Sequence, residues 1–178
     1  MPKPHGRCVR RLLAGLSVGC AAAAAPGPAA WAAPADTVDQ PAPCWSDQIA
    51  VSASQTQGAA GHRGLTLVFA LAGGAEPCTL TGYPGVDSGN GGPPLHARPT
   101  PRGYMGGLPA GVEEPPTVTL SLSTQGQAVV EGLATDADGN QCPTYTDLVV
   151  TPPNVMQVYT VPATIDACGL EVHPVTAG

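Results

Sequence analysis

The stretch Leu65-Thr66-Leu67-Val68-Phe69-Ala70-Leu71 decides the fold class of this chain. Large apolar side chains occupy every second position, at Leu65, Leu67, Phe69 and Leu71. In an extended chain successive side chains point to opposite faces, so all four would lie on one face. The stretch therefore predicts a β-strand with one buried face.

Similar short apolar segments recur along the chain between clusters of Gly and Pro. Val118, Leu120 and Leu122 repeat the alternation. The predicted strands are 49–54, 65–71, 78–81, 117–122, 128–133, 147–151, 155–161 and 170–175. No segment after residue 32 keeps an apolar stripe at helical spacing over three turns. Seven to nine short strands in one domain predict an all-β, antiparallel β-sandwich, since alternating β and α units would need about ten helical residues between strands.

The first 32 residues have the features of a secretory signal. Four of the seven basic residues precede residue 12, an apolar stretch follows, and small residues flank Trp31. We expect cleavage after Ala32 and export, with 33–43 as a flexible Ala/Pro-rich leader and 44–178 as one β-sandwich domain of unknown function. The apolar stretch is too short and too interrupted by Gly for a stable membrane span. A competing interpretation makes Cys20 a lipid anchor, but Ser17 stands where a lipoprotein box has Leu.

The composition after residue 32 limits the class of partner. Three basic residues remain, Arg63, Arg98 and Arg102, beside all thirteen acidic ones, so the net charge is 3 − 13 = −10. Phosphate backbones and anionic lipid surfaces are bound through clustered Lys and Arg. The composition therefore argues against nucleic acid as a partner.

Four cysteines follow residue 32, at Cys44, Cys78, Cys142 and Cys168, without CxxC spacing. In an exported chain they predict two disulfides, because zinc ribbons and redox dithiols both need closely spaced pairs. Three pairings are possible. The sequential one closes the shortest loops, so we predict Cys44–Cys78 and Cys142–Cys168.

The order of these features resembles a known family. After Cys44 come C-T-L-T-G-Y-P-G-V at 78–86, then Cys142, L-V-V-T-P-P at 148–153 and C-G-L-E-V-H-P-V at 168–175. This arrangement resembles the domain of unknown function 4232 family of secreted and lipid-anchored actinobacterial proteins, over nearly all of the chain from Cys44 onward. The resemblance implies an extracytoplasmic, immunoglobulin-like β-sandwich with two disulfides and brings no established catalytic residues. Residues 72–77 depart from the family's usual N-T-G-type turn.

The stretch 84–116 is rich in Gly and Pro and poor in strand signal, with one short strand expected at 95–98. Loops of this length in a compact domain are often functional or disordered. Arg98, Arg102, Tyr104 and Met105 all lie here. We therefore take these four residues as a candidate contact loop on the surface.

No group of residues indicates catalysis or a bound cofactor. The only G-x-S-x-G match, at 15–19, lies in the expected signal and would be removed. His62, His96 and His173 are far apart in sequence, without the spacing of metal ligands. The sequence predicts neither a metal site nor a catalytic site.

Asp136, Asp138 and Asn140 alternate as oxygen ligands do in a calcium loop. However, Gln141 stands where such a loop needs Gly, and the twelfth position is Asp147. We favour a tight turn at 138–140, because Asp and Asn bond readily to their own backbone.

Two aromatic residues are given structural roles. Trp45 directly follows Cys44, and we expect its indole to pack against a disulfide inside the sandwich. We expect the ring of Tyr83 to be buried, with its hydroxyl bonded to backbone.

These observations favour a non-catalytic exported β-sandwich that acts as a binding module of the cell envelope or extracellular space, with an envelope protein or a glycan as partner. The alternative is a small-ligand or metal carrier of the envelope, suggested by the acidity and by the 136–140 loop. A third hypothesis, a glycan hydrolase using Glu113 and Glu114, is disfavoured, because adjacent residues of an extended chain point to opposite sides. We expect no enzyme activity and no cofactor.

Overall fold

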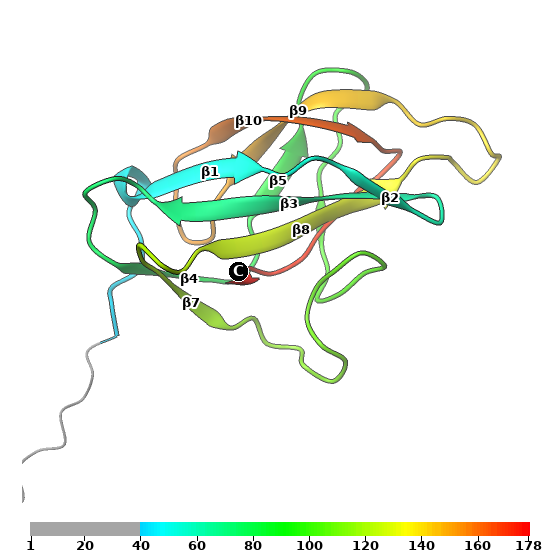
Figure 1. Cartoon of the computed structure of the whole chain (residues 1–178). Coiled ribbons are helices and arrows are strands. Elements are labelled where there is room, and N and C mark those ends of the chain that lie inside the picture. Colours follow the sequence, from blue (N-terminus) through cyan, green and yellow to red (C-terminus); the bar gives the residue numbers. More distant parts are fainter. Residues whose placement is uncertain (1–39) are drawn as a thin grey trace, which may run out of the picture. The chain divides into compact units, whose positions relative to one another are not determined.

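The computed structural model describes residues 40–178. The expected signal at 1–32, the lipid-anchor alternative at Cys20 and most of the expected leader lie outside the described residues. Within residues 40–178 the secondary structure consists of twelve β-strands and one short 3-10 turn, η1 (Ser46–Gln48). The predicted all-β, immunoglobulin-like sandwich with two disulfides is confirmed (Figure 1). No helix in this part of the chain is long and apolar enough to cross a membrane.

The larger sheet has the strand order β1-β3-β8-β11-β6 and is antiparallel except where β11 meets β6. Two short strands add to it, β2 beside β3 and β12 beside β8. Their bounds are β1 (Ile49–Ala53), β2 (Gln57–Ala59), β3 (His62–Leu71), β6 (Arg98–Pro99), β8 (Gly126–Leu133), β11 (Leu170–Val172) and β12 (Thr176–Ala177).

The remaining strands form two smaller antiparallel sheets, with the orders β10-β9-β5 and β4-β7. From top to bottom of Figure 1, β10, β1, β3, β8 and β7 follow one another. The bounds are β4 (Cys78–Thr81), β5 (Gly85–Ser88), β7 (Thr117–Leu120), β9 (Thr144–Thr151) and β10 (Tyr159–Asp166).

One hydrophobic core joins the sheets. Leu65, Leu67 and Phe69 of β3 are each at most 2% exposed, as the alternating pattern predicted. They belong to the same buried cluster as Leu148 of β9 and Leu120 of β7. Burial of each such side chain stabilises the fold by about 1.5–3 kcal/mol relative to exposure. The alternation in β3 therefore places this strand at the centre of the molecule.

The two disulfides have the predicted sequential pairing. Cys44 bonds to Cys78 at the start of β4, and Cys142 bonds to Cys168, with Cα atoms 4.8 Å and 5.0 Å apart. The closed loops separate the cysteines by 34 and 26 positions. On the chain-entropy model, loops of this length contribute about 3–4 kcal/mol each.

Most predicted strands differ from the observed ones by a few residues at one or both ends, and β10 and β7 show why. β10 begins at Tyr159 instead of residue 155, because the chain first turns, with the N–H of Val155 donating to the carbonyl of Pro152 at 3.2 Å. β7 ends at Leu120, and Leu122 is 94% exposed in the turn that follows. The predicted alternation of Leu122 with Leu120 was therefore wrong.

The stretch 84–116 is more ordered than the predicted surface loop. Its first part forms β5, which pairs with β9. The strand expected at 95–98 is displaced to β6, which pairs in parallel with β11. Isolated bridges join Asp87 to His96 and Arg102 to Gly107. Backbone hydrogen bonds therefore hold much of this Gly/Pro-rich stretch against the sheets.

Both assigned aromatic roles need correction. Trp45 is 74% exposed, because it precedes η1, a turn with no buried residue. Tyr83 is only half-buried. The environment predicted for Tyr83 belongs to Tyr145, which is 1% exposed and whose hydroxyl donates to the carbonyl of Pro93 at 2.6 Å.

Candidate functional site

Glu131 on β8 is a buried carboxylate on the outer face of the larger sheet. Ala128 and Val130 point into the core, so the alternation of the strand directs Glu131 outward. An outward Glu is ordinarily solvated, yet Glu131 is only 3% exposed. The covering segment is the loop 100–107, which contains most of the predicted contact loop.

Glu131 holds this loop by its backbone. The N–H of Tyr104 donates to Oε1 at 2.8 Å, and the N–H of Met105 donates to Oε2 at 2.6 Å. Hydrogen bonds to a carboxylate are about twice as strong as neutral ones. Gly103 permits the close approach, because a Cβ there would collide with Oε1 and lie 2.8 Å from Cε1 of His173. Glu131 and the glycine before Tyr104 therefore fix the path of the loop together.

His173, directly after β11, holds the start of the same loop. Its side chain is fully buried, and Nδ1 lies 3.0 Å from the carbonyl oxygen of Thr100. The Thr100 hydroxyl lies 3.2 Å from the same nitrogen, and because the carbonyl oxygen can only accept, the shorter contact favours the tautomer with the proton on Nδ1. Nε2 lies 3.6 Å from Oε1 of Glu131, which is too long for a hydrogen bond, and it has no other partner among the described residues. The Glu131–His173 pair thus lies buried beneath residues 100–105.

The tip of the loop presents an aromatic ring to solvent. Tyr104 stacks on His62 of β3, with ring centroids 4.3 Å apart and an interplanar angle of 13°. Tyr104 is nevertheless 60% exposed. Its neighbour Met105 turns inward onto β3, where a Cβ on Gly64 would lie 2.8 Å from the Met105 sulfur. The loop therefore offers Tyr104 for contact and uses Met105 for packing.

The two arginines of the predicted contact loop have different roles. Arg98 forms an ion pair with Glu171 of β11, and its side chain is 74% exposed. Arg102 is more enclosed and donates to the carbonyls of Leu108 and Pro109 and to the carboxylate of Glu113. Arg102 therefore orders the following segment, whereas Arg98 stays accessible from solvent.

A hollow of about 500 Å³ lies beside the loop on the same face of the sheet. Its apolar surface includes Leu133, which is half-exposed, and the Cys142–Cys168 disulfide contributes Cys168. Its charged groups are Arg98, Glu131, Asp136 and Glu171. The complete lining is His62, Arg98, Glu131, Gly132, Leu133, Thr135, Asp136, Ala137, Cys168, Gly169, Leu170 and Glu171.

The structure thus places Arg98, Tyr104 and Met105 at one face of the larger sheet, whereas the Arg102 side chain bonds to the segment that follows the loop. Glu131 and His173 lie at the same face, and the sequence analysis did not assign them to it. Glu131 lies in the segment V-V-E-G-L and His173 in E-V-H-P-V. A charged or titratable residue inside an apolar strand segment is the signal that could have drawn attention to both.

The favoured turn at 138–140 is present but begins earlier, at Asp136, whose carbonyl accepts from the N–H of Gly139 at 3.1 Å. Oδ1 of Asp136 accepts from the N–H groups of Asp138 and Asn140, and Oδ2 accepts from the Asn140 side chain. The side-chain and backbone hydrogen bonds from Asn140 are the main causes that lower the pKa of Asp136. Residues 40–178 contain no group of three or more His, Cys, Asp or Glu side chains placed to hold a metal ion.

Comparison with protein-family models matches residues 44–177 to a domain of unknown function (DUF4232). This is the family that the spacing of cysteines and the C-T-L-T-G-Y-P-G-V segment suggested. Comparisons with curated proteins and with solved structures gave no match.

Proposed function

The chain belongs to the DUF4232 family, and from this premise we propose that it is an exported, non-catalytic interaction module of the cell envelope or extracellular space. Its contact surface comprises Tyr104, Arg98 and the hollow beside them. The partner is an envelope protein or a glycan.

The observation that carries this proposal is the fixed, exposed ring of Tyr104. His62 supports the ring, and Glu131 holds the backbone beneath it. A side chain that is already ordered loses little conformational entropy on binding, and tyrosine is enriched at interface hot spots. The adjacent hollow combines apolar surface at Leu133 with charged groups such as Arg98, which suits a polypeptide or a sugar ring.

Export is supported by the two disulfides, which persist in oxidising compartments, and by the signal-like composition of residues 1–32. If the signal is cleaved as expected, the intact mass of the exported protein corresponds to a chain that begins at Ala33, less four hydrogens for two disulfides. A diacylglycerol on Cys20 would instead establish the lipid-anchored form.

A non-catalytic role is supported by the partners of the candidate carboxylates. Both oxygens of Glu131 accept from backbone amides, and Glu113 pairs with Arg102. The ion pair of Glu113 weighs against a hydrolase mechanism that uses Glu113 and Glu114 as its two carboxylates. Turnover of a peptidase, esterase or glycosidase substrate that one point substitution abolishes would contradict the proposal.

The second candidate function, a carrier of a small ligand, is favoured by the size of the hollow. About 500 Å³ falls within the range of small-molecule sites, roughly 300–1,000 Å³. Native mass spectrometry of protein purified from its own source separates the two functions. A bound small molecule of constant mass supports the carrier, and apo protein alone contradicts it.

The interaction module is tested by affinity capture from envelope extract with matched bait variants. Tyr104→Ser and Leu133→Asp alter the proposed surface, while Met156→Ser alters a residue that is 95% exposed in the β9–β10 connection. A specific partner should bind the unmodified domain and Met156→Ser and should be lost from the other two variants. Equal capture by all four baits would refute this contact surface.

A further inference from the structure

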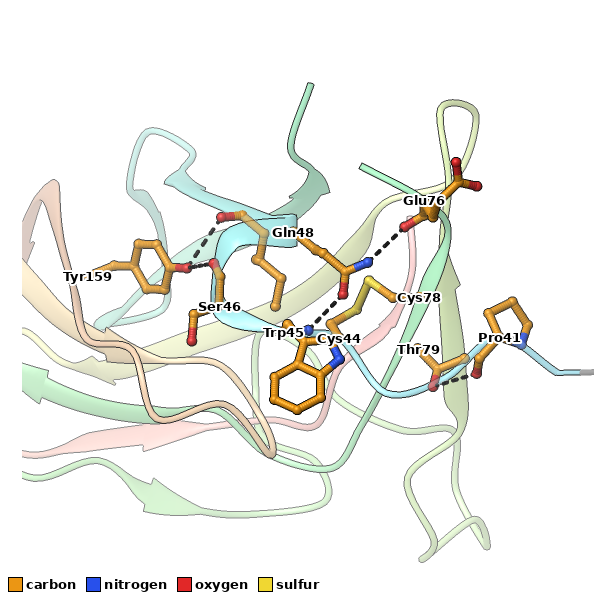
Figure 2. Close-up of a disulfide and its surroundings, with 10 residues drawn as sticks. Pro41, Cys44, Trp45, Ser46, Gln48, Glu76, Cys78, Thr79 and Tyr159 are labelled. Carbon is orange, nitrogen blue, oxygen red and sulfur yellow. Dashed lines mark hydrogen bonds between the residues drawn. A yellow bond between two sulfur atoms is a disulfide. The ribbon is translucent and has the colours of Figure 1, made fainter. Parts of the chain in front are cut away.

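The outer side of β4 is covered by the chain that precedes η1. The N–H of Thr79 donates to the Ala42 carbonyl at 2.9 Å, and the Thr79 carbonyl accepts from the N–H of Cys44 at 3.0 Å. Figure 2 shows this segment beside β4, joined to it by the Cys44–Cys78 disulfide. Within residues 40–178, β4 pairs with one strand, β7. One edge of the sheet β4-β7 is therefore closed.

The other edge of this sheet, on β7, is open. Two residues that lie opposite each other in an antiparallel pair direct their N–H and C=O groups either toward each other or both away. Thr79 directs both groups toward residues 42–44, so Thr119, which lies opposite it, directs its own groups away from β4. Thr117 does the same, because strand geometry repeats at every second residue. None of these four groups of β7 has a hydrogen-bond partner within residues 40–178, and Figure 1 shows β7 as the lowest strand.

The region around this edge lacks the charged residues that ordinarily keep strand edges apart. Natural proteins protect open edges with charged side chains, especially Lys, or with β-bulges. Residues 77–86 and 115–130, which contain β4 and β7, hold no charged residue, although residues 33–178 include thirteen acidic ones. β7 also pairs with β4 without a shift in register. The open edge is therefore a neutral part of an acidic molecule.

The side chains of β7 suit a neighbouring strand of the same sequence. On the outer face the Thr81 hydroxyl donates to the Thr117 hydroxyl at 2.8 Å, and Thr79 lies opposite Thr119. Thr–Thr pairs across neighbouring strands stabilise a sheet. On the inner face Val118 is 3% exposed and belongs to the core, so a new strand at this edge requires no apolar side chain to leave the core.

We propose that two copies of this chain associate through β7, with the two strands antiparallel about a twofold axis at Val118. Thr117 of each copy then lies opposite Thr119 of the other, and each of these pairs exchanges two hydrogen bonds. All the open groups of β7 are thereby satisfied. Antiparallel pairing also separates Glu113 and Glu114 of one copy from those of the other, whereas parallel pairing would bring these carboxylates together.

A second copy matches this edge in three respects. It supplies a strand of the same length, open backbone groups at the same spacing, and threonines to lie opposite threonines. It also brings no charge to the edge. The edge shares no residue with the Tyr104 surface, so this association and the proposed function can fail separately.

Sedimentation equilibrium of the exported protein tests the association. Because β7 is short and the buried area is small, we expect a reversible dimer with a dissociation constant of about 10–500 µM. Added salt should strengthen the dimer, since it screens the repulsion between two acidic copies. A protein that stays monomeric up to about 1 mM would overturn the proposal. Weakening by salt would indicate an ionic interface and would also overturn it.

Substitutions on β7 test the edge. Thr119→Pro removes an N–H that bonds to no other group of the chain, so it should weaken the dimer at least about tenfold. Thr117→Glu places a carboxylate at the edge and should weaken the dimer about three- to tenfold. The matched control, Thr160→Glu, adds the same charge at an exposed threonine of β10 and should stay within about twofold of the unmodified protein. If Thr119→Pro does not fold, equal dissociation constants for the two Glu variants would still overturn the proposal.

Cysteine variants test the register. The Cα atoms of residue 117 and of residue 119 in the other copy should be about 5.5 Å apart, within the range of a disulfide. A mixture of Thr117→Cys and Thr119→Cys should therefore form a covalent heterodimer on mild oxidation. Either variant alone should form much less, because its cysteines lie about 7–8 Å apart. Faster cross-linking of one variant with itself would refute this register.

A peptide with the sequence of residues 116–121 distinguishes the two classes of occupant. It should compete with the second copy and shift the unmodified protein toward monomer. Saturable binding of this peptide to a protein that is itself monomeric would assign the edge to an extended segment of another protein and would refute a second copy as its occupant.

Discussion

Replacing Glu131 by Gln tests whether one carboxylate holds the loop over the sheet. Gln keeps the length of the side chain and one acceptor oxygen. Its NH2 group replaces the oxygen that accepts from either Tyr104 or Met105. One backbone N–H then faces another donor, and the remaining hydrogen bond loses its charge.

The cost follows from these two changes. A hydrogen bond to a charged group contributes about 1.5–3 kcal/mol, and an unsatisfied buried donor costs about 1–3 kcal/mol. Both amides lie in a part-buried loop, so water can satisfy some of the lost bonding. We therefore expect Glu131→Gln to lower the free energy of unfolding by about 2–4 kcal/mol.

Urea unfolding near neutral pH measures this loss. The control is Glu114→Gln, an exposed carboxyl, which should change the free energy of unfolding by no more than about 0.5 kcal/mol. Limited trypsin digestion then localises the effect. In the unmodified protein the Arg102–Gly103 bond should be cut slowly, because the Arg102 guanidinium is held by the Leu108 and Pro109 carbonyls.

Release of the loop in Glu131→Gln should speed that cut. The Arg98–Pro99 bond should resist in both proteins. Neither disulfide spans Arg102, so the fragments should separate in denaturant without reductant. A loss below about 0.5 kcal/mol together with unchanged cleavage would refute the reasoning. A large loss without faster cleavage would mean that Glu131 stabilises the sandwich and not the loop.

Three further experiments test other features of the structure. Gly103→Ala should destabilise the protein by about 1–3 kcal/mol, because its Cβ would collide with Glu131. Gly73→Ala, which has open space around it, should be near neutral. Equal melting temperatures of these two variants would contradict the close approach at Gly103. His173→Phe keeps a ring but removes the donor to the Thr100 carbonyl, so it should cost about 1–3 kcal/mol in urea unfolding, and a neutral result would show that this bond does not hold the loop. The backbone N–H of Asn90 is the main cause that lowers the pKa of Asp147 in the folded protein. The ionised Asp147 carboxylate therefore stabilises the fold fully above the unfolded-state pKa of about 3.9. This stabilisation is lost as the pH falls through the lower pKa of the folded state. The melting-temperature difference between the unmodified protein and Asp147→Asn should therefore shrink below about pH 4, and a difference independent of pH would contradict this.

The sequence predicted most reliably those strands whose own side chains decide their burial. β4 has the predicted bounds, and β3 contains the whole of 65–71, because alternating apolar residues face a common core. β5 escaped prediction, and the strand expected at 95–98 was displaced from β6, because the partners of β5 and β6, which are β9 and β11, come much later in the chain. A two-residue strand that contains Pro99 has no periodicity of its own, and only the backbone of β11 makes it a strand.

The same distinction between local and distant causes explains the aromatic residues. Trp45 was expected inside because it follows a disulfide cysteine. Whether an indole packs inward depends on the direction in which the chain leaves the cysteine, and here it enters η1, which has no buried residue. An exposed Trp beside a buried disulfide therefore reflects the path of η1.

The outer face of β8 connects the burial of Glu131 with the proposed contact surface. Period two places Val129, Glu131 and Leu133 on this face, and two apolar residues around a carboxylate indicate a covered patch. The cover comes from residues about 27 positions earlier, which no local pattern reveals. It extends over Val129, where Gly106 packs, but Leu133 remains 50% exposed beside the hollow. If the loop only shielded apolar surface, Leu133 would be covered as well. The uncovered end of the face, with Tyr104 fixed next to it, therefore keeps apolar surface exposed at the place where we propose that a partner binds.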